Sequence, residues 1–118
     1  MPSVFVDPDI EVSPQRVAGL MASDPDVQVV DVREPYEHEA GHIAGARHVE
    51  LERLAARAHT IDPERPVVFQ CRLGVRSAMA AHAFRRAGYD AYTMRGGLVL
   101  WVAEGLPLAP EGGYVADH

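Results

Sequence analysis

The chain alternates between short apolar runs and polar, turn-forming stretches. Three runs, residues 27–32, 67–70 and 91–94, are largely apolar or β-branched, and none exceeds six residues. Runs of this length with little polar alternation are typical of strands that are buried on both faces. Residues 46–49 form a fourth, shorter candidate. We therefore predict strands at these four places.

Apolar residues at helical spacing fill the intervals between the predicted strands. Ser13 followed by Pro14 is typical of an N-cap and a first helical position, and the apolar residues after it recur on one face. The clearest helix begins at Ser77, has an alanine-rich face and ends at Gly88. These two segments are predicted to pack against the sheet.

The remaining segments are shorter. A short helix is predicted from Leu51 and a final helix over residues 98–104, whereas proline and glycine make residues 34–46 irregular. Strands that alternate with helices indicate an α/β fold with a parallel sheet and helices on both faces. A length of 118 residues fits a single domain. We expect its core over residues 10–108 and a peripheral tail over residues 109–118.

Charge and composition exclude several classes of function. The net charge is −6 and no basic run is present, which argues against nucleic acid or an anionic membrane as partner. All eleven basic residues are arginine, so lysine Schiff-base chemistry is excluded and guanidinium groups must bind any anion. The alanine- and arginine-rich, lysine-free composition suggests a bacterial genome.

Cysteine usage and the start of the chain suggest a compartment. One cysteine cannot form an internal disulfide, and the first ten residues resemble no secretory signal. No stretch approaches the about twenty apolar residues of a membrane span. We expect the cytosol, where a thiol stays reduced.

The cysteine follows the second predicted strand. In an open α/β sheet, ligands bind beyond the carboxyl ends of strands, where a helix N-terminus offers unpaired N–H groups. Cys71 lies at such a point, and five residues separate it from Ser77. Gly74 permits a tight loop whose amides converge on an anion. Arg72 and Arg76 add positive charge, which stabilises the reactive thiolate, so we predict a nucleophile rather than a merely buried cysteine.

Three motifs resemble those of the rhodanese family of sulfurtransferases. CRLGVRS (residues 71–77) resembles the family's active-site loop, and DVREPYEHEAGHIAGARHV (residues 31–49) resembles its upstream signature. RGGLVLWVAEGLPL (residues 95–108) is similar to its C-terminal signature. The motifs occur in the family's order and cover roughly residues 10–108.

The resemblance implies a single rhodanese-like domain with a mostly parallel five-stranded sheet. Cys71 would accept a sulfane sulfur from a small anionic donor such as thiosulfate and become a persulfide. Cyanide, a thiol or a partner protein would then accept the sulfur, without a cofactor or a metal. The oligomeric state stays open. The implied substrate-binding residues form the loop: Arg72, Leu73, Gly74, Val75, Arg76 and Ser77.

We expect different tasks for these loop residues. The backbone amides hold the thiolate and the persulfide, while Arg72 and Arg76 attract the donor. Ser77 is expected to cap the following helix, with its hydroxyl facing the Cys71 sulfur. Leu73 stands where some thiosulfate-active members carry a cation, which suggests a less charged donor or weak thiosulfate binding.

Two other functions stay open. Phosphatases and arsenate reductases of this fold have a loop one residue longer, because they surround a tetrahedral oxyanion. Here four residues separate Cys71 from Arg76, which favours sulfur. A non-catalytic rhodanese-like binding module is the other alternative, although such modules often lack the cysteine.

The segment HEAGH matches the zinc-peptidase pattern H-E-x-x-H. That chemistry requires His38 and His42 on one face of a helix, and Gly41 weakens such a helix. We interpret the match as accidental. Asp31 and Arg33, at the end of a predicted strand, are expected to support neighbouring loops rather than to catalyse.

Overall fold

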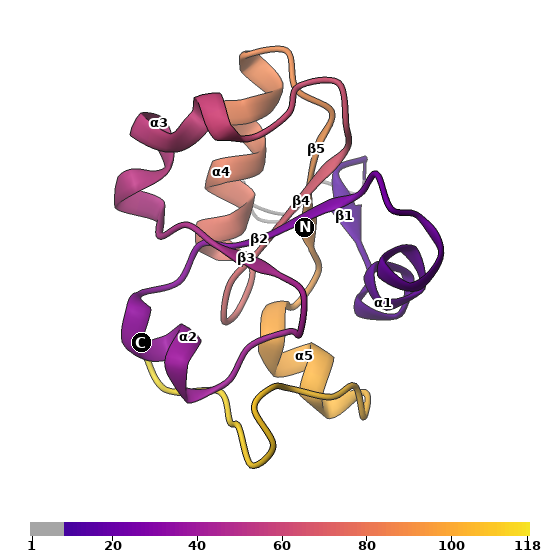
Figure 1. Cartoon of the computed structure of the whole chain (residues 1–118), viewed down its shortest axis with the longest axis vertical. Coiled ribbons are helices and arrows are strands. Elements are labelled where there is room, and N and C mark those ends of the chain that lie inside the picture. Colours follow the sequence, from indigo (N-terminus) through magenta and orange to yellow (C-terminus); the bar gives the residue numbers. More distant parts are fainter. Residues whose placement is uncertain (1–8) are drawn as a thin grey trace, which may run out of the picture.

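Five parallel strands form the centre of the molecule (Figure 1). The computed structural model describes residues 9–118. The strands are β1 (Glu11–Val12), β2 (Gln28–Asp31), β3 (Arg47–His48), β4 (Val67–Gln70) and β5 (Ala91–Met94), in the spatial order β1-β5-β4-β2-β3. Because all five are parallel, their carboxyl ends lie at one edge of the sheet.

Helices connect these strands. They are α1 (Pro14–Ser23), α2 (Pro35–Ala40), α3 (Leu54–Arg57), α4 (Val75–Arg86) and α5 (Gly97–Ala103), with 3₁₀ turns η1 (Leu51–Arg53) and η2 (Ala58–Thr60) on either side of α3. Within residues 9–118, no helix is both long enough and apolar enough to cross a lipid bilayer.

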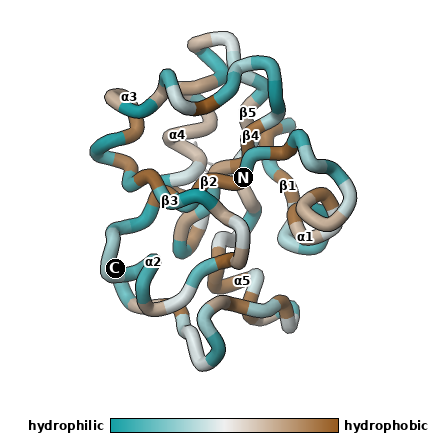
Figure 2. Tube along the Cα trace, viewed as in Figure 1, coloured by the Kyte–Doolittle hydropathy of each residue, from teal (hydrophilic) through white to brown (hydrophobic). Residues whose placement is uncertain are grey.

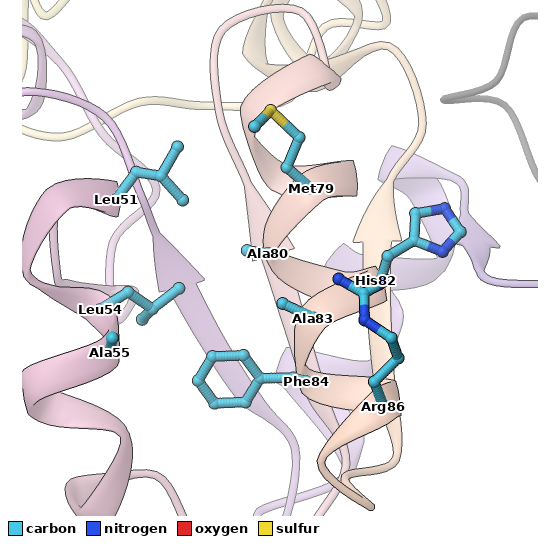
Figure 3. A pocket seen from close by; sticks show the side chains of 9 residues that line it. All are labelled: Leu51, Leu54, Ala55, Met79, Ala80, His82, Ala83, Phe84 and Arg86. Carbon is cyan, nitrogen blue, oxygen red and sulfur yellow. The ribbon is translucent and has the colours of Figure 1, made fainter.

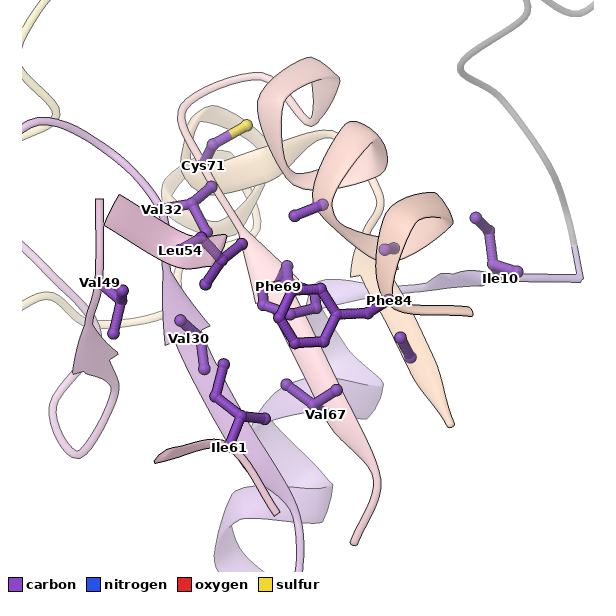
Figure 4. Close-up of a cluster of buried hydrophobic side chains, with 13 residues drawn as sticks. Ile10, Val30, Val32, Val49, Leu54, Ile61, Val67, Phe69, Cys71 and Phe84 are labelled. Carbon is purple, nitrogen blue, oxygen red and sulfur yellow. The ribbon is translucent and has the colours of Figure 1, made fainter. Parts of the chain in front are cut away.

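The sheet divides the core into two clusters, because successive strand residues point to opposite faces. Val67 and Phe69 of β4 pack on one face with α3 and α4, where Phe84 contacts Phe69 (Figure 4). Val68 packs on the other face with residues of α1 and α5, including Trp101. Figure 2 shows the hydrophobic residues concentrated in the central strands. The prediction that helices cover the strands on both faces is confirmed.

The boundaries of most elements agree with the sequence patterns. β4 and β5 cover the predicted ranges, β2 and β3 lie inside theirs, and α5 is displaced by one residue. At α1, the Ser13 hydroxyl oxygen accepts a hydrogen bond from the Arg16 N–H at 3.2 Å, as expected of an N-cap.

Three predictions need correction, and one strand had no sequence signal. The helix α4 begins at Val75 with Gly74 as its N-cap, so Ser77 lies inside the first turn and does not cap it. Residues 34–46 include a six-residue helix, α2, which starts at Pro35. The segment from Leu51 is a succession of 3₁₀ and α turns. The fifth strand that the resemblance implied is β1, and its two residues do not belong to an apolar run that could have predicted it.

Candidate active site

Cys71 lies directly beyond the carboxyl end of β4, between that strand and α4. The residue is 1% exposed and closes one end of a core cluster, with its sulfur pointing away from the other side chains (Figure 4). β4 pairs with β2 on one side and β5 on the other, so the cysteine projects from the middle of the sheet edge. The cysteine is therefore almost completely covered by the surrounding protein.

Backbone amides converge on the Cys71 sulfur. The Gly74 N–H donates to Sγ at 3.0 Å and the Ser77 N–H donates at 3.5 Å. Gly74 has a φ of 102°, a left-handed conformation that a side chain would strain, and this turn starts α4. The sulfur therefore lies at the N-terminus of a twelve-residue helix, where N–H groups and the helix dipole favour a negative charge.

The first turn of α5 holds the other side of the cysteine loop. The Leu98 N–H donates to the Cys71 carbonyl at 2.9 Å, and the Val99 N–H donates to the Arg72 carbonyl at 3.1 Å. A Cβ at Gly97 would lie 2.4 Å from the Arg72 oxygen and 2.7 Å from the Cys71 oxygen. Glycine at this position thus permits the N–H groups of α5 to bind the loop carbonyls. These hydrogen bonds hold one side of the loop, and the Gly74 and Ser77 amides on its other side face the sulfur.

A buried hydroxyl group lies beside the sulfur and is hydrogen-bonded to a second one. Ser77 Oγ is 3.5 Å from Cys71 Sγ and 2.7 Å from Thr93 Oγ1, and it also donates to the Gly74 carbonyl at 3.2 Å. Both Ser77 and Thr93 are buried. The structure thus places the Ser77 hydroxyl beside the Cys71 sulfur, as expected.

Arg76 forms a two-pronged ion pair with Glu37 of α2. Its Nη1 and Nη2 atoms donate to the two carboxylate oxygens at 2.8 and 3.0 Å, and Glu37 is fully buried. Burial raises the pKa of Glu37, but the hydrogen bonds from Arg76 and from the Glu34 backbone outweigh it, so the pKa lies below its ordinary value. The hydrogen bonds to Glu37 raise the pKa of Arg76.

This ion pair bears on the expected task of Arg76. Both terminal nitrogens of the guanidinium face Glu37, so the pair fastens the start of α4 to α2. The attraction of an anionic donor by Arg76 stays a prediction, and the geometry gives the residue a structural task beside it.

A second buried ion pair supports the same edge of the sheet. Arg33 Nε and Nη2 donate to the two oxygens of Asp31 at 2.9 and 2.8 Å, and Nη2 also donates to the Gly41 carbonyl. Burial raises the pKa of Asp31. The Arg33 guanidinium and a contact with His38 lower it by more, so the pKa lies below its ordinary value. These contacts join β2 to the end of α2, which agrees with the supporting role predicted for the pair.

The histidines of the HEAGH segment stack on one another. The rings of His38 and His42 lie 4.0 Å apart between centroids, and His48 lies 4.5 Å from His38 on its other side. The helix α2 ends at Ala40, before His42, so the helical spacing that a zinc peptidase requires is not formed. Within residues 9–118 no group of metal-ligating side chains could hold an ion.

Two apolar side chains of the loop lie at the protein surface. Leu73 is 55% exposed and Val75 is 47% exposed, so both form an apolar rim at the protein surface. Arg72 is less exposed, and its Nη2 donates to a carboxylate oxygen of Asp117 at 3.3 Å. The structure thus brings the predicted loop residues together around Cys71, although their side chains do not all face the sulfur.

A groove of about 660 Å³ lies between α3 and α4, outside this site (Figure 3). Leu54, Met79 and Phe84 are among its lining residues, and the view shows these side chains facing the space between the two helices. Cys71 does not line the groove. The groove and the site both adjoin α4, but none of the residues that hydrogen-bond to the sulfur lines the groove.

Sequence reasoning missed four residues of the site. Glu37 belongs to the upstream motif, and Gly97 belongs to the paired glycines of the C-terminal motif, yet neither motif says what the residue touches. Thr93 lies on β5 among apolar neighbours, where a buried hydroxyl signals a specific partner. For Asp117, at the end of the predicted peripheral tail, we find no sequence signal.

The chain matches a family model and is similar to several known proteins. The family model for the rhodanese-like domain matches residues 13–104. A protein from Allochromatium vinosum named sulfurtransferase is 35% identical over 104 residues, which cover 86% of this chain and 97% of that protein. Thiosulfate sulfurtransferase GlpE of Pseudomonas aeruginosa is 35% identical over 91 residues, which cover 76% of this chain and 81% of GlpE.

The chain is also similar to a further bacterial protein and to a solved structure. The uncharacterized protein YqhL of Bacillus subtilis is 43% identical over 75 residues, which cover 63% of this chain and 60% of that protein. The crystal structure of a rhodanese-related protein from Thermoplasma volcanium superposes with a TM-score of 0.78 at 24% identity, covering 85% of this chain and 97% of that one. This likeness concerns the fold.

Proposed function

Because this chain belongs to the rhodanese-like domain family, and two of its relatives are named sulfurtransferase and thiosulfate sulfurtransferase, we propose that it transfers a sulfane sulfur through a persulfide on Cys71. The observation that carries the proposal is the convergence of the Gly74 and Ser77 amides on the cysteine sulfur at the N-terminus of α4. Such donors stabilise a thiolate, which is the nucleophilic form of cysteine.

In the first step the Cys71 thiolate attacks the outer sulfur of thiosulfate. A bond forms between the two sulfurs, the sulfur–sulfur bond of thiosulfate breaks, and sulfite leaves with the electron pair. The new persulfide keeps one negative charge. That charge lies mainly on the outer sulfur, next to the Sγ atom that the Gly74 and Ser77 amides face, and the N-terminus of α4 favours a negative charge there.

In the second step a thiophilic acceptor attacks the outer sulfur of the persulfide. With cyanide, thiocyanate forms and the Cys71 thiolate is released, so neither atoms nor electrons are left over. A thiol or a partner protein with a reactive cysteine would accept the sulfur in the same way. The covalent intermediate divides one transfer into two displacements and predicts ping-pong kinetics. Because Cys71 must stay reduced between turnovers, the cytosol suits this cycle.

Burial of the nucleophile supports a small donor. Cys71 is 1% exposed, so a terminal sulfur atom that projects from its donor can reach the thiolate more easily than a bulky disulfide. Thiosulfate has this shape. We assign Arg72 to the oxyanion end of the donor, because Arg76 already holds Glu37 with both terminal nitrogens.

The same ion pair weighs against phosphate or arsenate chemistry. A cysteine phosphatase needs the loop arginine to bind the oxygens of the transferred group, and here the Arg76 guanidinium faces a buried carboxylate. Turnover of an aryl phosphate that depends on Cys71 would revive this alternative.

The test is the intact mass of the protein after incubation with thiosulfate and then with cyanide. We expect a gain of one sulfur atom, its loss on cyanide addition with release of thiocyanate, and neither change in Cys71→Ser. Transfer that survives in Cys71→Ser would refute the persulfide. If neither thiosulfate nor other sulfane donors add sulfur to the reduced protein, a binding module becomes the better interpretation.

A further inference from the structure

The tail (residues 109–118) returns from α5 along α2 toward the cysteine loop. Figure 1 shows it passing below α5 and ending beside α2. Ala109 and His42 exchange two backbone hydrogen bonds, of 2.7 and 2.9 Å, and the Tyr114 N–H donates to the Ala40 carbonyl at 3.0 Å. A Cβ at Gly41 would lie 2.5 Å from the Tyr114 oxygen, so glycine at this position lets the tail pass closely.

The end of the tail lies at the candidate active site. The Tyr36 hydroxyl donates to the Asp117 backbone carbonyl at 3.1 Å, which fixes the tail on α2. The Asp117 carboxylate then accepts a hydrogen bond from Arg72 Nη2 at 3.3 Å. Arg72 directly follows the nucleophile in the sequence, so a negative charge of the tail lies on the cation nearest to Cys71 along the chain.

The two arginines of the loop differ in the partners they hold. Arg76 binds a fully buried carboxylate through both of its terminal nitrogens. Arg72 binds Asp117 through a single terminal nitrogen, and the Asp117 side chain is 96% exposed. Exposed ion pairs of this kind contribute little free energy and are screened by salt. An anion that enters the site can therefore displace Asp117 from Arg72, but it must compete with it.

We propose that Asp117 is a specificity-determining residue that competes with the donor's oxyanion for Arg72 and so disfavours dianionic donors relative to less charged ones. This inference rests on the proposed sulfur transfer for its kinetic consequence. Asp117 acts on donor binding and leaves the displacement at sulfur unchanged. The effect is thus expected in KM and not in kcat.

The test compares Asp117→Asn with the wild type for two donors that differ in charge. Thiosulfate is a dianion, and methanethiosulfonate presents the same outer sulfur as a monoanion. We expect the KM for thiosulfate to fall about three- to fivefold at low salt, in line with an exposed ion pair, and kcat to stay constant. The KM for the monoanion should fall less, and high salt should reduce both differences.

Two controls separate a local contact from a change in net charge. Glu111→Gln removes the same charge from an exposed position of the same tail and should leave both KM values unchanged. In an Arg72→Gln background, Asp117→Asn should not change the KM for thiosulfate, because the arginine for which Asp117 competes is absent. An unchanged KM in Asp117→Asn, an equal fall in Glu111→Gln, or a fall that persists without Arg72 would overturn the inference.

A binding measurement keeps this inference separate from the proposed function. Thiosulfate binding to Cys71→Ser protein, followed by calorimetry, requires no turnover. Tighter binding in the Cys71→Ser, Asp117→Asn double variant than in Cys71→Ser alone supports the competition even if the wild type transfers no sulfur. Equal binding in the two proteins refutes it, whatever the activity.

Discussion

Glu37 and Arg76 show how a single buried carboxylate positions the cysteine loop. Replacing Glu37 with glutamine keeps the shape of the side chain but leaves the Arg76 guanidinium, which is 17% exposed, without a charged partner. Breaking such a pair costs about 2–4 kcal/mol of unfolding free energy. Urea denaturation of the variant and of the wild type would measure this loss.

A matched variant on the same helix tests whether burial is the cause. Glu39 of α2 is exposed, and Glu39→Gln makes the same chemical change without touching Arg76. We expect a change within about 0.5 kcal/mol, as for most surface substitutions. Equal losses in the two variants would mean that helix charge, and not the ion pair, determines stability here.

The Ser77 hydroxyl is predicted to assist the sulfur as well as the fold. To stabilise the thiolate, the Ser77 hydroxyl must turn its one proton from the Gly74 carbonyl to the sulfur. Ser77→Ala removes this group, which lies 3.5 Å from Cys71 Sγ, and the transfer rate should fall about fivefold, the equivalent of one hydrogen bond. Thr93→Val removes the second hydroxyl of the pair without changing the contact with sulfur. It should lower stability by about 1–3 kcal/mol, because Ser77 loses a buried partner, and leave the rate nearly constant. Equal rates in the two variants would exclude a role for Ser77 in transfer.

At the scale of elements, the first turn of α5 determines the shape of the cysteine loop. Gly97→Ala would place a methyl group 2.4 Å from the Arg72 carbonyl oxygen, so the loop must move and the amides that face Cys71 must move with it. A displaced nucleophile can cost about a hundredfold in rate, and we expect at least a tenfold loss of persulfide formation. Mass spectrometry over a time course would measure it.

Gly88→Ala is the control for backbone strain. Gly88 also has a positive φ, of 93°, but a Cβ there would meet nothing within 4 Å. Both variants should lose about 1–2 kcal/mol of stability from the left-handed conformation. Only Gly97→Ala should lose activity. Loss of transfer in both would show that global destabilisation, and not the loop contact, is responsible.

An element could be predicted from the sequence when neighbouring residues alone determine it. The strands β4 and β5 were predictable because a local apolar run determines them. The start of α4 was misplaced by two residues, since Ser77 has the composition of an N-cap while the turn at Gly74 depends on its contacts with the sulfur. Local composition cannot show such a contact.

The residues of the site also differ in how far their contacts extend along the chain. The loop around Cys71 is contiguous in sequence, so its motif could be read directly. Its partners come from α2, β5 and the tail, and the distance in sequence between Arg76 and Glu37 leaves no periodic pattern that joins them. Pairings of this kind are visible only once the sheet brings the elements together.

At the scale of the whole molecule, three ionisable groups at the carboxyl edge of the sheet make stability depend on pH. Burial lowers the pKa of His38, the contact with Asp31 opposes this, and the charges of His42 and His48 lower it further, so the net direction is downward. The pKa values of Asp31 and Glu37 are also below their ordinary values. In all three cases the unfolded chain binds protons more readily than the folded chain, so stability falls as pH falls.

The three groups act in successive pH windows. For His38, loss of stability begins below its ordinary pKa of 6.5 and is complete at the lower pKa of the folded protein. For Glu37 and Asp31, loss begins below 4.5 and 3.8. Urea unfolding at a series of pH values between about 8 and 2 should give a constant free energy at the alkaline end and two phases of decline. His38→Gln, which keeps a donor for Asp31, should remove the first phase and retain the second. If His38→Gln leaves the first phase unchanged, another group titrates there and the stacked imidazoles do not determine it.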